Sequence, residues 1–235
     1  MSTAVIVFAK APVAGGAKTR LAPALGEAGA AALAERMLRH ALAQAVAAGI
    51  GPVELCAAPD ASHPVLRQAA EACGASLAEQ GPGDLGQRMH RALARRLVQH
   101  PQVLLIGTDA PALDAAILRQ AAEVLRDHDA VFVPALDGGY ALVGLRKADP
   151  RTFIGMRWSH PRVMDDTRER LRAAGLRWQE LAPVADIDEP ADLAQLPAGW
   201  LDGLPVSPGG GAAPGWTPSP AHSGPREGGP GGLRG

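Results

Sequence analysis

Aromatic side chains, paired cysteines, long apolar runs and an excess of one charge are all scarce or missing in this chain of 235 residues. Only 3% of the residues are aromatic, so no row of rings for stacking nucleic-acid bases is expected. No stretch of about 18 apolar residues runs without a charge, proline or glycine, which argues against a membrane-spanning helix. The 23 basic and 24 acidic residues leave a net charge of −1. This balance argues against a nucleic-acid partner.

The two cysteines, Cys56 and Cys73, stand singly in apolar segments, without the close pairing of a zinc site or a redox motif. We therefore expect both to be small core residues. The apolar run at residues 4–9 is too short for a secretory signal, and no basic residue precedes it. Together these features predict a cytoplasmic protein with no integral membrane contact.

One change in composition divides the chain. Residues 203–235 hold 11 glycines and seven prolines, with almost no bulky apolar side chains. Such a segment cannot bury enough apolar surface to offset the entropy lost on ordering. We predict one folded domain over residues 1–202 and a disordered Gly/Pro-rich tail over residues 203–235.

Short apolar runs alternate with longer amphipathic segments in the folded part. The runs predict strands at residues 4–9, 52–58, 76–79, 103–106, 130–134, 140–145 and 177–181. The amphipathic segments predict helices at residues 27–48, 61–73, 84–99, 114–127 and 161–174, with Asp114 and Pro161 at helix starts. This alternation indicates an α/β fold whose sheet is mainly parallel, with 140–145 as a possible antiparallel addition. Ligands bind at the carboxyl ends of the strands in such sheets.

The loop after the first strand combines glycines with cations. It reads Lys10-Ala11-Pro12-Val13-Ala14-Gly15-Gly16-Ala17-Lys18-Thr19-Arg20 and holds two of the three lysines in the chain. Glycines let backbone N–H groups approach an anion, and Lys and Arg neutralise phosphate charge. The Walker A pattern fails because neither of its glycine positions, residues 12 and 17, holds a glycine. A solvated basic loop is the alternative.

Carboxylates follow two later strands. Asp109, in Gly107-Thr108-Asp109, is a suitable ligand for Mg²⁺ beside a diphosphate, or else the cap of a turn. The segment Asp186-Ile187-Asp188-Glu189-Pro190 clusters three carboxylates, unless Asp188 caps a short helix. The segment Asp137-Gly138-Gly139-Tyr140 holds the only tyrosine, and it fits a functional loop and an ordinary hairpin equally well.

A second glycine-rich loop runs from Gln80 to Arg88 into a helix, where an anion or a base edge is readily held. Gln80, Asp84 and Arg88 are its candidate nucleotide contacts, although Asp84 as a simple helix cap explains the loop nearly as well. His160 precedes Pro161, and capping of the next helix by Ser159 or His160 is favoured over a catalytic role.

Five ordered segments resemble one bacterial family. They are FAKAPVAGGAKTRLAPALG, GDLGQRM, LLIGTDAPAL, PALDGGYALVGL and DIDEPADL, which together span residues 5–196. They are similar to the arsenosugar-biosynthesis-like glycosyltransferases of GT-A type, whose relatives include 2-phospholactate and molybdenum-cofactor guanylyltransferases. The resemblance implies a single Rossmann-like nucleotide-diphosphosugar transferase domain with helices on both faces of the sheet. It also implies binding of a nucleotide sugar or a nucleoside triphosphate, and of a small-molecule acceptor.

The resemblance implies roles for individual residues as well. The backbone around Ala9, Lys10, Pro12, Gly15 and Gly16 would line the base and ribose, and Lys18 and Arg20 would hold phosphates. A divalent cation, Mg²⁺ or Mn²⁺, would bind Asp109. Glycosyltransferases of this fold often present an Asp-x-Asp pair, so the second ligand here would be Asp186, Asp188 or water. The acceptor would lie along Asp137, Gly138, Gly139 and Tyr140, with Asp137 as the candidate base.

Three functions are compatible with these residues. Glycosyl transfer, with Lys18, Arg20 and the metal stabilising the departing phosphate, is the first expectation. Nucleotidyl transfer to a phosphorylated acceptor is the alternative, and a non-catalytic nucleotide-binding module is the third. The first breaks a sugar–phosphate bond and the second breaks the α–β phosphoanhydride. Convergence of the carboxylate cluster at Asp186 and Asp188 with Asp109 at one metal would favour nucleotidyl transfer.

Overall fold

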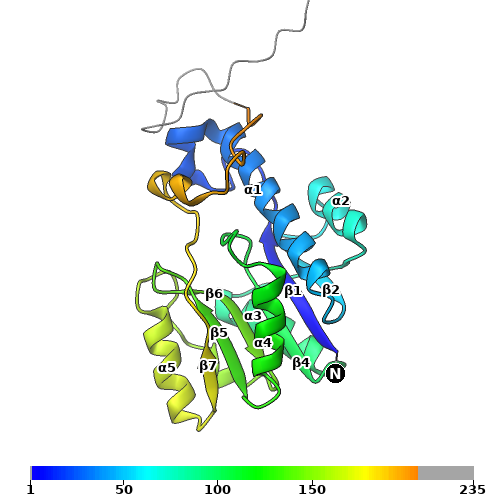
Figure 1. Ribbon diagram of the computed structural model, residues 1–235, viewed down its shortest axis with the longest axis vertical. Coiled ribbons are helices and arrows are strands. Elements are labelled where there is room, and N and C mark those ends of the chain that lie inside the picture. The colour runs from blue at the N-terminus through cyan, green and yellow to red at the C-terminus, as the bar shows by residue number, and fades with distance from the viewer. Residues whose placement is uncertain (1, 206–235) are drawn as a thin grey trace, which may run out of the picture.

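The computed structural model describes residues 2–205, which form one α/β unit (Figure 1). Its strands are β1 (Thr3–Lys10), β2 (Val53–Ala58), β3 (Ser76–Glu79), β4 (Gln102–Ile106), β5 (Ala130–Pro134), β6 (Tyr140–Leu145) and β7 (Trp178–Glu180). Its α-helices are α1 (Ala22–Ala48), α2 (Pro64–Cys73), α3 (Leu85–Leu97), α4 (Ala115–Val124) and α5 (Val163–Ala173). Three short 3-10 helices complete it, namely η1 (Thr19–Leu21), η2 (Pro150–Thr152) and η3 (Pro190–Gln195).

The strands of the described residues form a single sheet in the order β3-β2-β1-β4-β6-β5-β7. β1 lies in the middle of the parallel part, where Val5 pairs with Val53 on one side and Leu104 on the other. Only β6 runs antiparallel, pairing with both β4 and β5. The sheet is therefore mainly parallel with one reversed strand at 140–145, as the sequence predicts.

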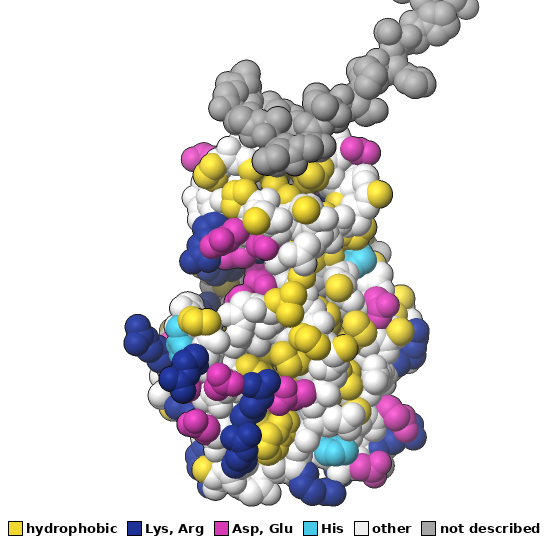
Figure 2. Space-filling model, turned by 60° about the vertical axis from the view of Figure 1, so that its left-hand side comes forward, with side chains coloured by type: hydrophobic (Ala, Val, Ile, Leu, Met, Phe, Trp, Pro, Cys, Tyr) yellow, Lys and Arg dark blue, Asp and Glu magenta, His cyan; other side chains and the backbone are white. Residues whose placement is uncertain are grey.

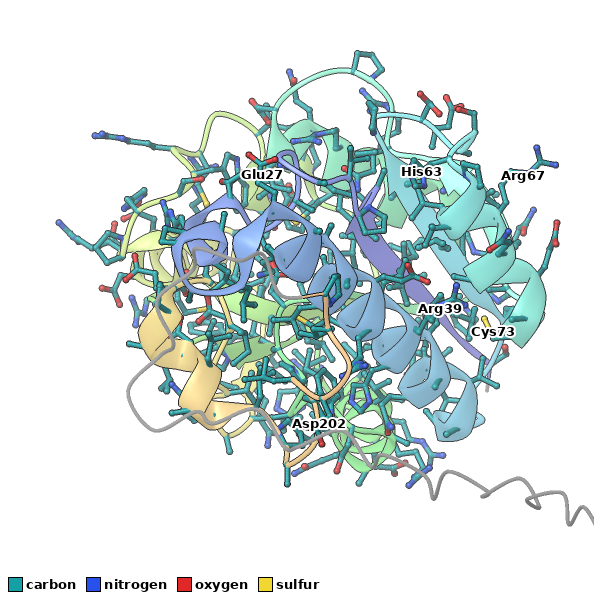
Figure 3. All side chains as sticks on the ribbon, turned by 90° about the horizontal axis from the view of Figure 1, so that it is seen from above. Glu27, Arg39, His63, Arg67, Cys73 and Asp202 are labelled. Atoms are coloured by element: carbon teal, nitrogen blue, oxygen red, sulfur yellow. The ribbon has the colours of Figure 1, made fainter. Side chains whose placement is uncertain are left out.

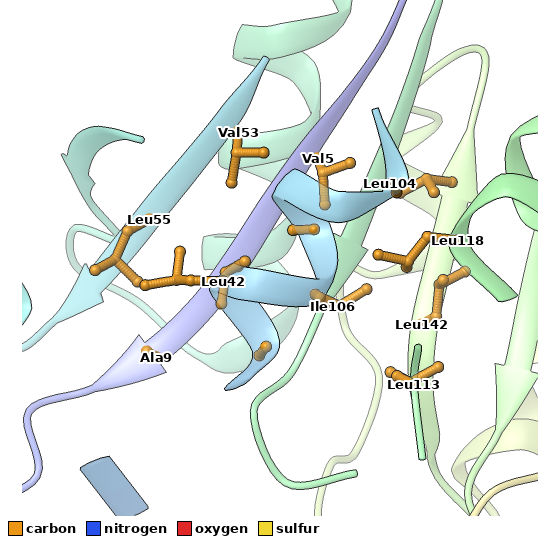
Figure 4. Packing of buried hydrophobic residues seen from close by; sticks show 14 of the residues in the cluster. Val5, Ala9, Leu42, Val53, Leu55, Leu104, Ile106, Leu113, Leu118 and Leu142 are labelled. Carbon is orange, nitrogen blue, oxygen red and sulfur yellow. The ribbon is translucent and has the colours of Figure 1, made fainter. Parts of the chain in front are cut away.

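Helices cover both faces of this sheet. On one face α1, α2 and α4 pack against the sheet through side chains that include Leu42, Leu66 and Leu118 (Figure 4). On the other face α3 and α5 contribute a second buried cluster, with Leu93 and Leu171 among its members. β1, β2 and β4 read as near-continuous apolar runs because each is covered on both sides. The expected arrangement of helices on both faces is confirmed.

A third apolar cluster lies above the carboxyl ends of the parallel strands. It joins η1, the first half of α1 and η3, and Leu21, Leu33, Met37, Ile187 and Leu193 are its buried members. We call this part the upper lobe, and Figure 1 shows it at the top of the view, with an extended segment rising to it from β7. Leu204 also packs here, two residues beyond the domain boundary expected at 202. The rest of the expected tail lies outside the described residues.

Several helix starts differ from the sequence expectations. α1 begins at Ala22, and it bends at Gly26, whose backbone is not helical. α5 begins at Val163 with Arg162 as its N-cap, so neither Pro161 nor the caps proposed at Ser159 and His160 is correct.

The other expected caps divide into two that are confirmed and one that is not. Asp84 caps α3 within a capping box, and Asp114 caps α4. Glu189 rather than Asp188 caps η3, since its carboxylate and the side chain of Asp192 form the reciprocal bonds of a capping box. This arrangement leaves Asp188 available to the site described below.

The remaining sequence expectations concern cysteines and membranes. Cys56 is fully buried in β2, and burial raises the pKa of its thiol to about 11, as fits a core residue. Cys73 is half-buried and free. Across residues 2–205, no helix combines the length and the apolar character that crossing a bilayer requires.

Replacing Asp114 with alanine is expected to lower the free energy of unfolding by about 1 kcal/mol. The carboxylate accepts a hydrogen bond from the N–H of Ile117 at 2.8 Å, and alanine leaves that donor without its cap. Chemical denaturation measures the change. Asp127→Ala, an exposed aspartate just beyond the same helix, is the matched control and is expected to change stability by less than half as much. Equal losses in the two variants would contradict the capping role.

Candidate active site

Four segments meet at the carboxyl edge of the sheet, between the sheet and the upper lobe. They are the loop after β1, the loop after β4, the β5–β6 turn and the segment that follows β7. The last three of these segments border a cavity of about 340 Å³, which is also lined by the segment preceding α5 and by the start of α3. A neighbouring hollow of similar volume shares Asp137, Asp186 and Asp188 with it. Figure 2 shows acidic and basic side chains gathered where the upper lobe meets the rest of the molecule.

Lys18 lies at the centre of this junction. Its ammonium is 2.7 Å from Asp109 Oδ1 and 3.7 Å from Asp188 Oδ1, and it donates to the carbonyl of Ile187 at 2.6 Å. The side chain is only 7% exposed, and the backbone is left-handed, with φ 49°. A lysine in this region of φ/ψ space is uncommon and is maintained by its surroundings. The structure thus fixes Lys18 as the charged group shared by two loops.

Arg20 extends the same network toward solvent. Its guanidinium is 2.7 Å from Asp188 Oδ2 and 3.9 Å from Glu189 Oε1. The N–H of Ile187 donates to the carbonyl of Asp109 at 2.8 Å, which attaches the segment after β7 to the loop after β4. Lys18 and Arg20 therefore reach the site as predicted, but both are already paired with carboxylates.

The predicted metal ligands divide into a pair and a separate residue. Asp109 and Asp188 approach the same ammonium from two loops, whereas Asp186 lines the neighbouring hollow together with Asp137 and Asp192. Within residues 2–205, no three His, Cys, Asp or Glu side chains are grouped as a ready metal site. Mg²⁺ commonly takes one or two protein carboxylates and completes its shell with phosphate oxygens and water. The pair of Asp109 and Asp188 fits that pattern, and the role of Asp186 as a ligand stays a prediction.

Asp186 has an unusual electrostatic environment. Burial raises the pKa of its carboxyl above the ordinary value, and the nearby carboxylates of Asp137 and Asp192 raise it further. Lys18 acts in the opposite direction with a smaller effect. Asp186 lines both hollows, so a cation arriving there would relieve this repulsion.

The loop after β1 is more closed than the sequence suggests. The N–H groups of Gly16 and Ala17 both donate to the carbonyl of Val13, so the N–H of Gly16 is used by the turn itself. Lys10 is exposed at the end of β1, and Pro12 is half-buried. A carboxylate oxygen of Glu27 lies 3.2 Å from the position a Cβ would take at Gly15. Figure 3 shows Glu27 near the start of α1, beside this loop.

The second glycine-rich loop is held by its own side chains. The buried amide of Gln80 donates to the carbonyls of Ala9 and Cys56, both at 3.1 Å, and accepts from Arg88 at 3.0 Å. Asp84 is used as the helix cap. Gln80, Asp84 and Arg88 therefore have partners within the protein, and the nucleotide contacts predicted for them stay a prediction. They fix the loop beside the end of β1.

The predicted acceptor segment forms a hairpin and also a wall of the cavity. Asp137 Oδ1 accepts from the N–H of Gly139 at 2.8 Å, and Asp137, Gly139 and Tyr140 all line the cavity. Gly138 has φ 92°, and a Cβ there would overlap the carbonyl of Pro161. The carbonyl of Gly138 accepts from the N–H of Met164 at 2.8 Å. Glycine at 138 is required because the hairpin is in direct contact with the start of α5.

Sequence reasoning missed part of the cavity wall. Leu85 and Met89 belong to the apolar stripe of α3 that predicted the helix, and both also line the cavity. Trp158 lines it from the segment before α5, and its indole packs against Gly86. A Cβ at residue 86 would lie 2.9 Å from that indole. The one available signal was a tryptophan in a chain with few aromatic residues.

The fold is that of the nucleotide-diphospho-sugar transferases and nucleotidyltransferases. A protein from Desulfovibrio desulfuricans G20, assigned as a nucleotide-diphospho-sugar transferase, superposes with a TM-score of 0.75 and 32% identity. The match covers 82% of this chain and 85% of that one. The 4-diphosphocytidyl-2C-methyl-D-erythritol synthase from Anaerococcus prevotii DSM 20548 shares the fold, with a TM-score of 0.57 and 12% identity over 83% of this chain and 95% of that one.

Residues 26–160 match the family described as "Uncharacterized protein conserved in bacteria (DUF2064)". The chain belongs to this family. It is also 32% identical over 190 residues to a 3-phospho-D-glycerate guanylyltransferase from Phenylobacterium zucineum (strain HLK1). That match covers 78% of this chain and 85% of the relative. The comparisons therefore favour nucleotidyl transfer, the alternative of the sequence analysis, over glycosyl transfer, its first expectation.

The raised pKa of Asp186 predicts a stabilising effect of Asp186→Asn that depends on pH. The folded state binds the proton more tightly than the unfolded chain, so the free energy of unfolding falls as pH rises above the ordinary pKa of 3.8. The Asn variant lacks this loss, so its melting temperature should exceed that of the parent near pH 7.

The advantage of the Asn variant should disappear below about pH 4, where the parent carboxyl is protonated in both states. Asp149→Asn provides the control of opposite sign. Hydrogen bonds from Arg151 lower the pKa of Asp149 to about 2, so this variant should lose stability at neutral pH. Thermal melts between acid and neutral pH measure both, and a neutral-pH loss in Asp186→Asn would contradict the analysis.

Proposed function

We propose that this protein is a nucleotidyltransferase that moves a nucleoside monophosphate from a nucleoside triphosphate onto a small phosphorylated acceptor. The observation that carries the proposal is the convergence of Asp109 and Asp188 on the ammonium of Lys18. The sequence analysis named convergence of such carboxylates at one metal as the feature that would favour nucleotidyl transfer, and here two of them meet around an ammonium. The 32% identity to a guanylyltransferase supports the same reading and makes a guanine nucleotide the first donor to test.

In the proposed reaction a phosphate oxygen of the acceptor attacks the α-phosphorus of the triphosphate. The bond from the α-phosphorus to the α–β bridging oxygen breaks, and pyrophosphate leaves with the electron pair. Negative charge therefore develops on the departing diphosphate. Lys18 and Arg20 each contact a carboxylate at the edge of the cavity. Both cations are therefore close to the place where the charge of the departing diphosphate would be held. Preorganised charge of this kind commonly supplies a large part of catalysis.

A divalent cation bound there would act as a Lewis acid on phosphate oxygens and draw the acceptor and donor together. Asp109 and Asp188 are the residues that would hold it. Lys18 keeps these two carboxylates in place while the site is empty of substrate, since its ammonium contacts both. At an effective dielectric constant near 20, one such charge contact at 4 Å is worth about 4 kcal/mol before desolvation. This preorganisation is the role we assign to Lys18, together with contact to phosphate.

Glycosyl transfer is the second candidate, because the solved structure at 32% identity is assigned to the nucleotide-diphospho-sugar transferases. The two reactions are separated by their donors. We expect Mg²⁺-dependent thermal stabilisation by GTP or another nucleoside triphosphate, exceeding that by any GDP- or UDP-sugar. A ligand at 100 times its dissociation constant adds about 2.7 kcal/mol, which a melting curve detects. Stabilisation by a nucleotide sugar alone would replace the proposal with glycosyl transfer, and stabilisation by no nucleotide would reject both.

Lys18→Met is expected to reduce pyrophosphate release from the triphosphate about 100-fold, because it removes the charge but keeps most of the side-chain length. The assay follows pyrophosphate in the presence of Mg²⁺ and a mixture of small phosphate monoesters. Lys147→Met is the matched control, since this lysine is exposed and, among the described residues, forms no ion pair with Asp109 or Asp188. Near-parental turnover in Lys18→Met, with circular dichroism showing a folded protein, would overturn the role of Lys18.

A further inference from the structure

The ammonium of Lys18 lies among three oxygen atoms that belong to two segments. It is 2.7 Å from Asp109 Oδ1, 2.6 Å from the carbonyl oxygen of Ile187 and 3.7 Å from Asp188 Oδ1. Carboxylate and backbone carbonyl oxygens are also the ligands that a hard divalent cation takes from a protein. The ammonium therefore occupies a position whose surroundings suit a metal ion.

The ammonium is enclosed, whereas the carboxylates around it face solvent. The side chain of Lys18 is 7% exposed, and those of Asp109 and Asp188 are 55% and 40% exposed. An ion from solution can therefore reach the carboxylates directly. A phosphate that is to accept a hydrogen bond from Lys18 must first compete with Asp109 and with the carbonyl of Ile187, which both lie at hydrogen-bond distance.

The net charge of this cluster does not favour an anion. Lys18 and Arg20 contribute two positive charges. The carboxylates paired with them contribute three negative charges, so the cluster carries a net charge of −1, and these carboxylates belong to Asp109, Asp188 and Glu189. A divalent cation changes this net charge to +1, and a triphosphate is then attracted to the cluster. Binding of the cation should therefore precede or accompany binding of the triphosphate.

We infer that Lys18 occupies the position of the divalent cation in the free protein and leaves it when the metal ion binds. Asp109, Asp188 and the carbonyl of Ile187 then become ligands of the metal, and the released ammonium turns to the phosphates of the donor. The flexible four-carbon stem of lysine permits this movement while the backbone stays in place. The inference rests on the proposed function, in which a divalent cation and a triphosphate bind, and it specifies how the same carboxylates serve both cations.

Lys18→Met tests this displacement in the absence of nucleotide. The substitution removes the competing charge, so Mn²⁺ should bind the variant at least tenfold more tightly than the parent protein, a difference of about 1.4 kcal/mol. Isothermal titration calorimetry measures both affinities. Because the same variant is expected to lose turnover, metal affinity and activity should change in opposite directions.

A lysine that only holds the two carboxylates together predicts the reverse, because the metal site would be less ordered without it. Equal or weaker binding of Mn²⁺ to the variant therefore overturns the inference, and so does absence of binding to both proteins.

Two further variants locate the effect. Lys147→Met removes an exposed lysine that is not paired with Asp109 or Asp188 among the described residues, and it should retain the parental affinity for Mn²⁺. Adding Asp109→Asn to Lys18→Met should abolish the gain in affinity, because one of the proposed ligands loses its charge. A gain that persists in this double variant, or that also occurs in Lys147→Met, would overturn the inference.

Chemical labelling tests the displacement in the parent protein, where no substitution can disturb folding. The chain has three lysines, at positions 10, 18 and 147, so acetylation by acetic anhydride can be followed at each by mass spectrometry. Lys18 is nearly buried and the other two are exposed, so Lys18 should react most slowly without metal. Saturating Mn²⁺ should raise its rate several-fold relative to Lys147, and GTP should lower it again. An unchanged or slower rate at Lys18 with Mn²⁺ would overturn the inference.

Failure of the inference can be distinguished from failure of the proposed function. If GTP stabilises the protein with Mg²⁺ and pyrophosphate is released, but Lys18→Met does not bind Mn²⁺ more tightly, nucleotidyl transfer is retained and the displacement of Lys18 is rejected. If no triphosphate binds and no pyrophosphate is released with any monoester, nucleotidyl transfer is rejected. The Mn²⁺ titration contains no nucleotide, so it still decides by itself whether Lys18 and the metal ion compete.

Discussion

The position of one ammonium group organises the functional end of this molecule. Lys18 contacts a carboxylate from the loop after β4 and another from the segment after β7, together with a carbonyl of that segment. These segments are far apart in the sequence. Lys18 is nearly buried while Asp109 and Asp188 are exposed, and removing both carboxylates would leave a nearly buried charge uncompensated, which is costly. The ammonium of Lys18 holds these segments together and is also the charge proposed to contact the substrate phosphate. The organisation of the site without substrate is therefore linked to its proposed chemistry.

The fold was largely predictable because its signals are local and repeated. Apolar runs such as residues 4–9 and 103–106 mark strands buried on both faces, and the capping residues Asp84 and Asp114 mark two helix starts. Errors occurred where tertiary contacts decide the conformation. The start of α5 is set by contact between Gly138 and Pro161, 23 residues apart in sequence, and composition around Pro161 carries no trace of it.

The site was predicted in its charged part and in the turn that precedes β6. Lys18, Arg20, Asp109, Asp137 and Asp188 do lie around the cavity or at its edge, since charged residues in loops at strand ends are informative. Gln80 and Arg88 bond within the protein, and their nucleotide contacts stay a prediction, because a polar side chain in a glycine-rich loop looks the same in sequence whether it faces a ligand or its own backbone. The apolar wall was missed for a related reason. Leu85 and Met89 follow the helical period that core residues follow, and exposure to a cavity leaves no separate pattern.

The antiparallel direction of β6 has a consequence for how such a protein diversifies. Because β6 runs against its neighbours, its first residue, Tyr140, and the turn before it lie at the carboxyl edge of the sheet. The wall formed by that turn and the segment before α5 is encoded after residue 130, whereas both glycine-rich loops are encoded before residue 90. Mutations in the later stretch can therefore remodel one wall and leave the earlier loops untouched. Selection can therefore change the ligand specificity that depends on this wall, while the specificity that depends on the two glycine-rich loops is inherited intact.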